Sequence, residues 1–202
     1  MHDMQGDYQS EIIKKTRNDV LFTIDDGPGK YTSKIAKTLD SLEYEGIFFV
    51  IGKEITEKNK YMLIEAAKMW HKIWNHSFSH PNFARLDMQS AKEEILRTDS
   101  LINEILCEAG VDQKQKYIRY PYGNQPPASY REEFNDFLDS LWYTEPSMYR
   151  RMDTDLKDWR SKPIDQKIDK IKENDTILLH EKSRTPEVIN KIVQNLDNKK
   201  EH

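Results

Sequence analysis

Two adjacent acids, Asp25 and Asp26, directly follow an apolar run and precede a glycine and a proline. Asp, Gly and Pro all favour turns, so the segment taken alone predicts a turn at the end of a strand. A second interpretation gives the carboxylates different work, one binding a cation while its neighbour acts as a base. Because successive side chains of an extended chain point in different directions, the two acids need not compete for one position.

Two histidines offer nitrogen ligands at a matching spacing. His76 and His80 are four residues apart, so both imidazoles can reach one ion if the backbone turns helically. Taken alone, such a pair is a weak signal for metal. Pro81 disfavours a long helix and predicts a short turn at a strand end. Together with Asp26 the histidines would supply three ligands and leave one position open for water, as in catalytic zinc sites.

Arg119 and His180 also end apolar runs. Arg119 is either a surface arginine before a loop or the partner of a buried carboxylate, which it would hold ionised. Pro121 would fix the backbone so that the amide of Tyr122 could serve as an oxyanion donor. His180 is either a polar residue emerging from a sheet or a general acid, because its protonation range lies near neutrality. A later acid cluster, Asp153 to Asp158, has the composition of a solvated loop.

Short apolar runs alternate with amphipathic stretches along the chain. We expect strands at 19–24, 46–52, 117–121 and 176–180, and helices at 32–45, 58–70, 90–110 and 131–138. The segment 147–159 is ambiguous, and we interpret it as a strand running into a loop. The alternation predicts an α/β fold with a parallel sheet, whose reactive groups gather at the carboxyl ends of the strands. Four candidate residues lie at such ends: Asp25, His76, Arg119 and His180.

Length and composition predict one soluble globular domain over residues 1–202, with its core at about 18–182. The net charge of −4 argues against a nucleic-acid partner, and no run of apolar residues is long enough for a transmembrane segment. The single cysteine, Cys107, excludes an internal disulfide and a multi-cysteine zinc cage, and its apolar neighbours predict a small buried side chain. The polar N-terminus predicts a cytoplasmic protein, or an extracellular or periplasmic one if a signal peptide was removed. The oligomeric state is left open.

With these segments in this order, the sequence resembles the polysaccharide deacetylases, the fourth carbohydrate esterase family, also called the chitooligosaccharide-deacetylase homology domain. The pattern of that family is T-F-D-D-G, H-[ST]-x-x-H, R-x-P-[YFG], D-x-x-D-W and a strand ending L-x-H. The corresponding segments here are 23–27, 76–80, 119–122, 155–159 and 178–180. The run "GIFFVIG" also resembles the second strand of the family.

The resemblance implies a distorted, partly open (β/α) barrel of seven or eight strands. It also implies a divalent ion, usually zinc but alternatively Co, Ni or Mn, held by Asp26, His76 and His80. An ion held in this way acidifies water and polarises an acetyl carbonyl.

The resemblance further implies catalytic roles for side chains around the ion. Asp25 would be the general base, Arg119 its charge partner and His180 the general acid. Asp158 would tune His180, and the Tyr122 amide would share the oxyanion. Three residues would contact the substrate: Trp159 as an apolar wall, Tyr120 and Leu178.

The implied activity is metal-dependent removal of acetyl groups from N-acetylated amino sugars of a polysaccharide or oligosaccharide, peptidoglycan-like or chitin-like. Three alternatives remain: an amidohydrolase acting on a small non-sugar amide or imide, an O-acetyl xylan esterase, and a catalytically silent glycan-binding protein. The intact set of candidate residues counts against silence.

Some residues depart from the family pattern. Ile24 replaces Phe, Glu181 replaces the common Asp after the last histidine, and Trp74 stands where Gly is common. We expect Trp74 to narrow the substrate cleft. We expect four aromatic residues to be exposed and able to stack on sugar rings: Tyr120, Tyr122, Trp142 and Tyr143. For Trp142, packing in the core is an equally good expectation.

Overall fold

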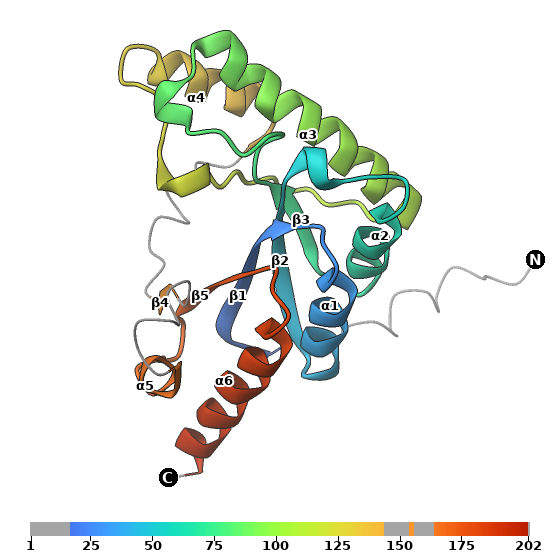
Figure 1. Ribbon diagram of the computed structural model, residues 1–202, viewed down its shortest axis with the longest axis vertical. Coiled ribbons are helices and arrows are strands. Elements are labelled where there is room, and N and C mark those ends of the chain that lie inside the picture. Colours follow the sequence, from blue (N-terminus) through green and yellow to red (C-terminus); the bar gives the residue numbers. More distant parts are fainter. Residues whose placement is uncertain (1–16, 144–153, 156–163, 202) are drawn as a thin grey trace, which may run out of the picture.

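The structure of the protein is a computed structural model that describes residues 17–143, 154–155 and 164–201 (Figure 1). Its centre is a parallel sheet with the strand order β3-β2-β1-β5-β4. The strands are β1 (Arg17–Gly27), β2 (Tyr44–Val50), β3 (Lys72–Asn75), β4 (Thr154–Asp155) and β5 (Thr176–His180). Every pairing in this sheet is parallel, which confirms the α/β class.

Two further segments continue the sheet beyond β3. Asn75 forms a parallel bridge with Ile118, and Lys116 forms another with Tyr143. The described residues therefore place seven neighbouring segments side by side, five strands and two bridged segments, without closing the sheet. This is the partly open form of a (β/α) barrel.

Helices cover the outer face of the sheet. They are α1 (Thr32–Ser41), α2 (Lys60–Lys68), α3 (Met88–Ala109), α4 (Arg131–Ser140), α5 (Ile164–Ile168) and α6 (Thr185–Lys200). Short 3-10 turns lie at Gly52–Glu54, Phe83–Arg85 and Pro121–Gly123. Figure 1 shows α3 and α4 at one end of the molecule and α6 at the other, and α1 contacts both α2 and α6. Within the described residues, no helix is both long and apolar enough to cross a bilayer.

The alternation of side chains along the strands separates a core from a site-bearing face. Ile24 of β1 and Leu179 of β5 belong to the main core beneath the helices. Their neighbours along the strands, Thr23 and Asp25 on β1 and His180 on β5, therefore point to the opposite, concave face. On that face another cluster, of Ile47, Phe49, Trp74 and Tyr117, packs inside the barrel.

Several expected elements match the structure. The strands expected at 19–24 and 176–180 lie within β1 and β5, and the long helix ends at Gly110, which has a left-handed φ of 70° as a C-cap should. Most of the ambiguous segment 147–159 lies outside the described residues, and so do Asp158 and Trp159.

Two expectations are wrong. The run 117–121 is not an extended strand: it makes one bridge at Ile118, and the chain then enters a 3-10 turn at Pro121, which has no N–H to donate. Cys107 is exposed rather than buried. The buried stripe of α3 includes Ile102, Ile105 and Leu106, and the next position along the helix turns away from it.

Candidate metal centre and active site

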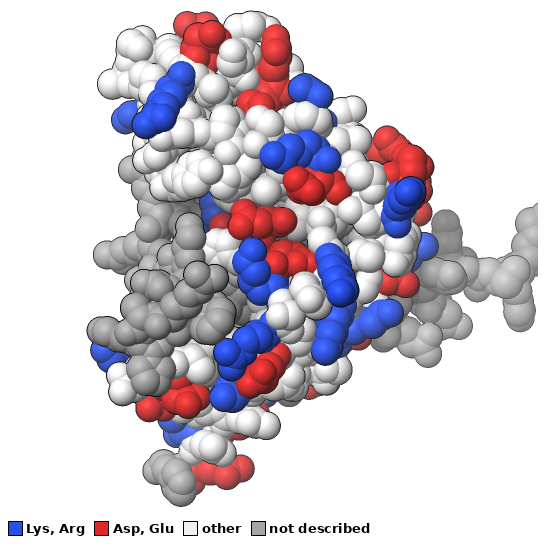
Figure 2. All heavy atoms as spheres, in the orientation of Figure 1, with Lys and Arg blue, Asp and Glu red and all other residues white. Residues whose placement is uncertain are grey.

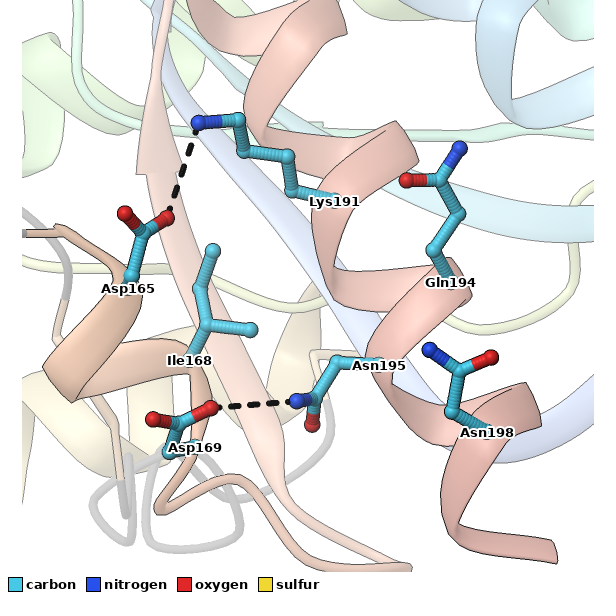
Figure 3. Close-up of a pocket in the computed structure, with 7 residues that line it drawn as sticks. All are labelled: Asp165, Ile168, Asp169, Lys191, Gln194, Asn195 and Asn198. Atoms are coloured by element: carbon cyan, nitrogen blue, oxygen red, sulfur yellow. Dashed lines mark hydrogen bonds and ion pairs between the residues drawn. The ribbon is translucent and has the colours of Figure 1, made fainter.

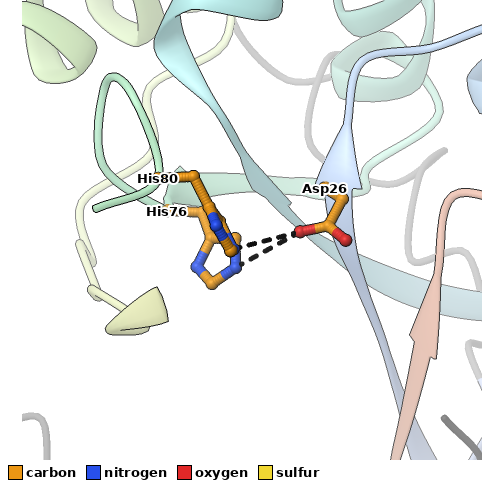
Figure 4. A group of neighbouring side chains, drawn as sticks. All are labelled: Asp26, His76 and His80. Carbon is orange, nitrogen blue, oxygen red and sulfur yellow. Dashed lines mark ion pairs between the residues drawn. The ribbon is translucent and has the colours of Figure 1, made fainter. Parts of the chain in front are cut away.

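Three side chains converge at the carboxyl end of the sheet (Figure 4). Asp26 lies near the end of β1, His76 directly follows β3, and His80 lies on the loop after it. The Oδ1 atom of Asp26 is 3.6 Å from Nε2 of His76 and 3.4 Å from Nε2 of His80. Both distances are long for hydrogen bonds. Two ligands about 2.1 Å from one ion at a tetrahedral angle are about 3.4 Å apart, so the three groups fit a divalent cation.

The loop that carries the histidines turns through left-handed residues rather than through a helix. Ser77 has φ 68° and His80 has φ 61°, and Asp26 opposite them has φ 71°. The Ser77 hydroxyl accepts a hydrogen bond from the His80 amide at 3.1 Å, which closes the turn. Backbone bonds from Gly52 and Lys53 to the carbonyls of Ser77 and Phe78 tie the loop to the end of β2. Left-handed non-glycine residues cost free energy, and they cluster at functional sites.

The orientation of the His76 ring also suits a metal ligand. Its Nδ1 lies 2.7 Å from the carbonyl oxygen of Arg119, so Nδ1–H is the donor and Nε2 keeps its lone pair. This Nε2 is the atom that faces Asp26. Burial lowers the pKa of His76, which keeps the imidazole neutral, the form that binds metal.

Asp25 forms a buried ion pair on the concave face. Nη1 of Arg119 contacts Oδ1 of Asp25 and also donates to Thr23 Oγ1 at 3.1 Å. The other carboxylate oxygen, Oδ2, lies 3.8 Å from Nε2 of His76 and so faces the candidate metal ligands. Burial raises the pKa of Asp25 to about 6, while Arg119 and His180 oppose that increase. The structure therefore places Arg119 beside a buried carboxylate, the second of the two alternatives open from the sequence.

His180, Leu178 and Tyr122 complete the surroundings. His180 ends β5 in register with Asp25 on the adjacent strand, so their side chains leave the same edge of the sheet. Leu178, two positions earlier, shares that face and is 7% exposed. Tyr122 has φ 60°, and its ring packs edge-on against His80 with 4.8 Å between ring centres. Tyr122 is 64% exposed, so it lies open to solvent beside the candidate metal ligands.

Several aromatic residues differ from the expectation in whether they are buried or exposed. Tyr120 is buried and packs against Phe83, and Tyr143 is buried as well, so the prediction that their rings are open for stacking is wrong. Trp142 is 81% exposed, although the sequence favoured core packing for it as strongly as exposure. Trp74 is buried against Tyr117 and Phe49 below the site. Its ring therefore fills the barrel instead of narrowing an open cleft.

Thr23 is a site residue that sequence reasoning left without a role. It is fully buried. Its hydroxyl oxygen accepts a hydrogen bond from the Arg119 guanidinium, and the hydroxyl donates to the Ile177 carbonyl at 3.1 Å. A threonine inside an otherwise apolar run was the available signal, because a buried hydroxyl needs hydrogen-bond partners.

A separate pocket of about 220 Å³ lies between α5 and α6 (Figure 3). Lys191 pairs there with Asp165, and Asn195 donates to Asp169. Because α6 begins at Thr185 beside His180, this pocket starts about 9 Å further along the helix and is not part of the candidate site. On the face shown in Figure 2, basic and acidic side chains are interspersed.

Comparison with known proteins gives the family. Residues 13–137 match the polysaccharide deacetylase family. The chain is 30% identical over 151 residues to a peptidoglycan-N-acetylglucosamine deacetylase of Bacillus cereus, covering 73% of this chain and 48% of the relative. It is 28% identical over 191 residues to the peptidoglycan-N-acetylmuramic acid deacetylase PdaC of Bacillus subtilis, covering 91% and 37% respectively. The chain belongs to the polysaccharide deacetylase family.

A solved structure supports the fold. A family 4 carbohydrate esterase from Streptomyces lividans in complex with acetate superposes with a TM-score of 0.69 at 22% identity, covering 91% of this chain and 90% of that one. By contrast, the chain spans about half or less of the length of the two curated relatives. The family depends on divalent metal, and the group of Asp26, His76 and His80 is a possible site for such an ion.

Proposed function

We propose that the protein is a metal-dependent deacetylase that removes acetyl groups from N-acetylated amino sugars of a peptidoglycan-like or chitin-like glycan. The observation that carries the proposal is the position of the Asp25–Arg119 ion pair directly beside the three candidate metal ligands. A base next to a cation site is the arrangement that hydrolysis of an unreactive amide requires. The names of the two Bacillus relatives support an acetylated sugar as the substrate.

Zinc is the metal that we propose, with cobalt, nickel or manganese as substitutes. Two neutral imidazoles and one carboxylate form a ligand set typical of catalytic zinc, which keeps a position open for water or substrate. A bound ion would polarise the acetyl carbonyl and make water more acidic. Asp26, His76 and His80 would hold it.

The side chains around that site have distinct tasks in this proposal. Asp25 takes a proton from the attacking water through Oδ2, because Arg119 occupies its Oδ1. The water oxygen bonds to the acetyl carbon, and the amide C–N bond then breaks. His180 donates a proton to the departing amine, which would otherwise be a poor leaving group. The Tyr122 amide donates a hydrogen bond to the oxygen that becomes negatively charged.

Acetate release tests the proposal. Purified protein would be offered N-acetylglucosamine oligomers and peptidoglycan, before and after removal of metal with a chelator. We expect acetate from at least one of these substrates, loss of release with chelator, and recovery when zinc is added. Cyclic imides and acetylated xylan in the same panel test the rival activities. Turnover confined to either of these, or glycan binding without hydrolysis by zinc-loaded protein, would contradict the proposal.

A further inference from the structure

The side chain of Asn75 forms a hydrogen bond with the loop that carries His76 and His80. Asn75 is the last residue of β3, is 1% exposed and directly precedes His76. Its Oδ1 accepts a hydrogen bond from the Ser77 amide at 2.8 Å. Ser77 in turn accepts from the His80 amide through its hydroxyl, so the Asn75 side chain supports the turn between the two histidines.

A buried tyrosine holds that asparagine. The Asn75 amide nitrogen donates to the hydroxyl of Tyr143 at 2.9 Å and to the carbonyl of Ile95 at 3.1 Å. The Tyr143 hydroxyl donates to Oδ1 of Asp99 on α3 at 2.9 Å. Tyr143 and Asp99 are both more than nine-tenths buried, and Asp99 Oδ2 accepts from Lys116 at 2.9 Å.

The chemistry of these groups fixes which group donates and which accepts in each of these hydrogen bonds. An ionised carboxylate can only accept, so the Tyr143 hydroxyl must donate to Asp99. That leaves the hydroxyl oxygen as the acceptor for the Asn75 nitrogen, and the Asn75 oxygen as the acceptor for the Ser77 amide. Rotating the Asn75 amide by 180° would place two donors face to face at Ser77, so only one orientation satisfies every group.

We propose that Asp99, Tyr143 and Asn75 are positioning residues for the metal centre. They form a buried relay from α3 to the loop of His76 and His80 and fix the left-handed backbone that brings the two imidazoles together. None of the three side chains is a candidate ligand, so they act through Ser77. The inference rests on the proposed function in one respect: Asp26, His76 and His80 must bind a metal ion.

The chain offers a matched control for the relay. Tyr44 is also buried, and its hydroxyl also donates to an aspartate, Asp19. It lies at the first residue of β2, about 20 Å along the strand from the carboxyl edge that carries the site. Tyr44→Phe therefore removes a comparable hydrogen bond without touching the metal loop.

Zinc affinity of metal-free protein, measured by competition with a chromophoric chelator, tests the relay. We expect Tyr143→Phe to weaken zinc binding about 10-fold or more, the range for outer-shell partners of metal ligands, and Tyr44→Phe to leave it unchanged. The visible absorption spectrum of the cobalt-loaded protein should change in Tyr143→Phe and not in Tyr44→Phe. If Tyr143→Phe does not fold, Asp99→Asn is measured in the same way and should also bind zinc more weakly than the wild type.

Two results would overturn the relay, and a third would overturn the metal centre itself. Wild-type zinc affinity in Tyr143→Phe, or in Asp99→Asn where that variant stands in for it, would overturn the relay. Equal weakening in Tyr143→Phe and Tyr44→Phe would do the same, because a general loss of stability would then explain both. Failure of the wild-type protein to bind zinc would instead overturn the metal centre and with it the proposed function.

Discussion

Arg119 and Asp25 form an ion pair in which both side chains are 6% exposed, and the guanidinium also donates a hydrogen bond to the Thr23 hydroxyl. The pair links the segment between α3 and α4, which bridges to β3 at Ile118, to the end of β1, which lies far away in the sequence. Two buried charges that face each other are costly to separate, because either one alone would be left in an apolar environment.

Replacing Arg119 with Met keeps most of the side-chain volume but removes the charge. We expect the free energy of unfolding of the metal-free protein to fall by about 3 kcal/mol or more, since Asp25 is left buried without its partner. Deacetylation should fall about 100-fold or more. Urea unfolding and acetate release measure the two effects. Asp25→Asn combined with Arg119→Met should cost less than the sum of the single changes, and strict additivity would show that the pair is not coupled.

The lowered pKa of Asp19 makes the free energy of unfolding depend on pH. Burial alone would raise its pKa, but hydrogen bonds from Lys200, Tyr44 and Arg17 outweigh burial and lower the pKa to about 2. A carboxyl whose pKa is lower in the folded than in the unfolded protein stabilises the fold above the unfolded pKa. We therefore expect up to about 2 kcal/mol of stability to be lost between about pH 4 and pH 2.

Urea unfolding of metal-free protein across that pH range checks the expectation. Asp19→Asn should be less stable than the wild type at pH 6, and the difference should shrink as the pH falls to 2. A difference that stays constant from pH 6 to pH 2 would mean that Asp19 does not carry the effect.

Glu181 supports the turn that follows the two adjacent acids. Its Oε1 accepts the Tyr31 amide at 2.5 Å at the start of α1, and its own amide donates to the Asp25 carbonyl at 2.9 Å. We expect Glu181→Ala to lower the free energy of unfolding by about 1 kcal/mol, as loss of a helix cap does. Glu181→Gln keeps an oxygen acceptor and should cost much less. Urea unfolding of both variants gives the comparison, and equal costs would show that the hydrogen bond to Tyr31 does not matter.

The parts of the fold that follow local rules could be predicted from the sequence. β1 and β5 carry compact apolar runs, and α3 has an amphipathic stripe that ends at Gly110. The segment around Ile118 was harder, because its place in the sheet depends on a single bridge to Asn75, more than 40 residues away. Cys107 was misplaced because apolar neighbours in sequence do not fix which side of a helix a residue occupies.

The candidate site shows the same division. Asp26, His76 and His80 were found because each belongs to a short motif at a strand end. The residues alone left open whether Arg119 has a buried partner, since pairing with Asp25 depends on how the sheet brings distant segments together. Only the family resemblance implied that Asp25 is that partner. The buried contact of Tyr143 with Asp99 and Asn75 has no local signal, and Tyr143 itself was expected to face solvent.

In the proposed mechanism, Asp26 holds the metal while Asp25 moves the proton. Asn tolerates left-handed backbone, so Asp26→Asn can keep the φ of 71° at that position while losing the charge. The most direct test is a zinc titration of Asp25→Asn and Asp26→Asn together with acetate release. We expect Asp25→Asn to bind zinc and release no acetate, and Asp26→Asn to bind zinc at least about 10-fold more weakly. Near-normal acetate release by Asp25→Asn, or wild-type zinc affinity in Asp26→Asn, would contradict this division of roles between the two acids.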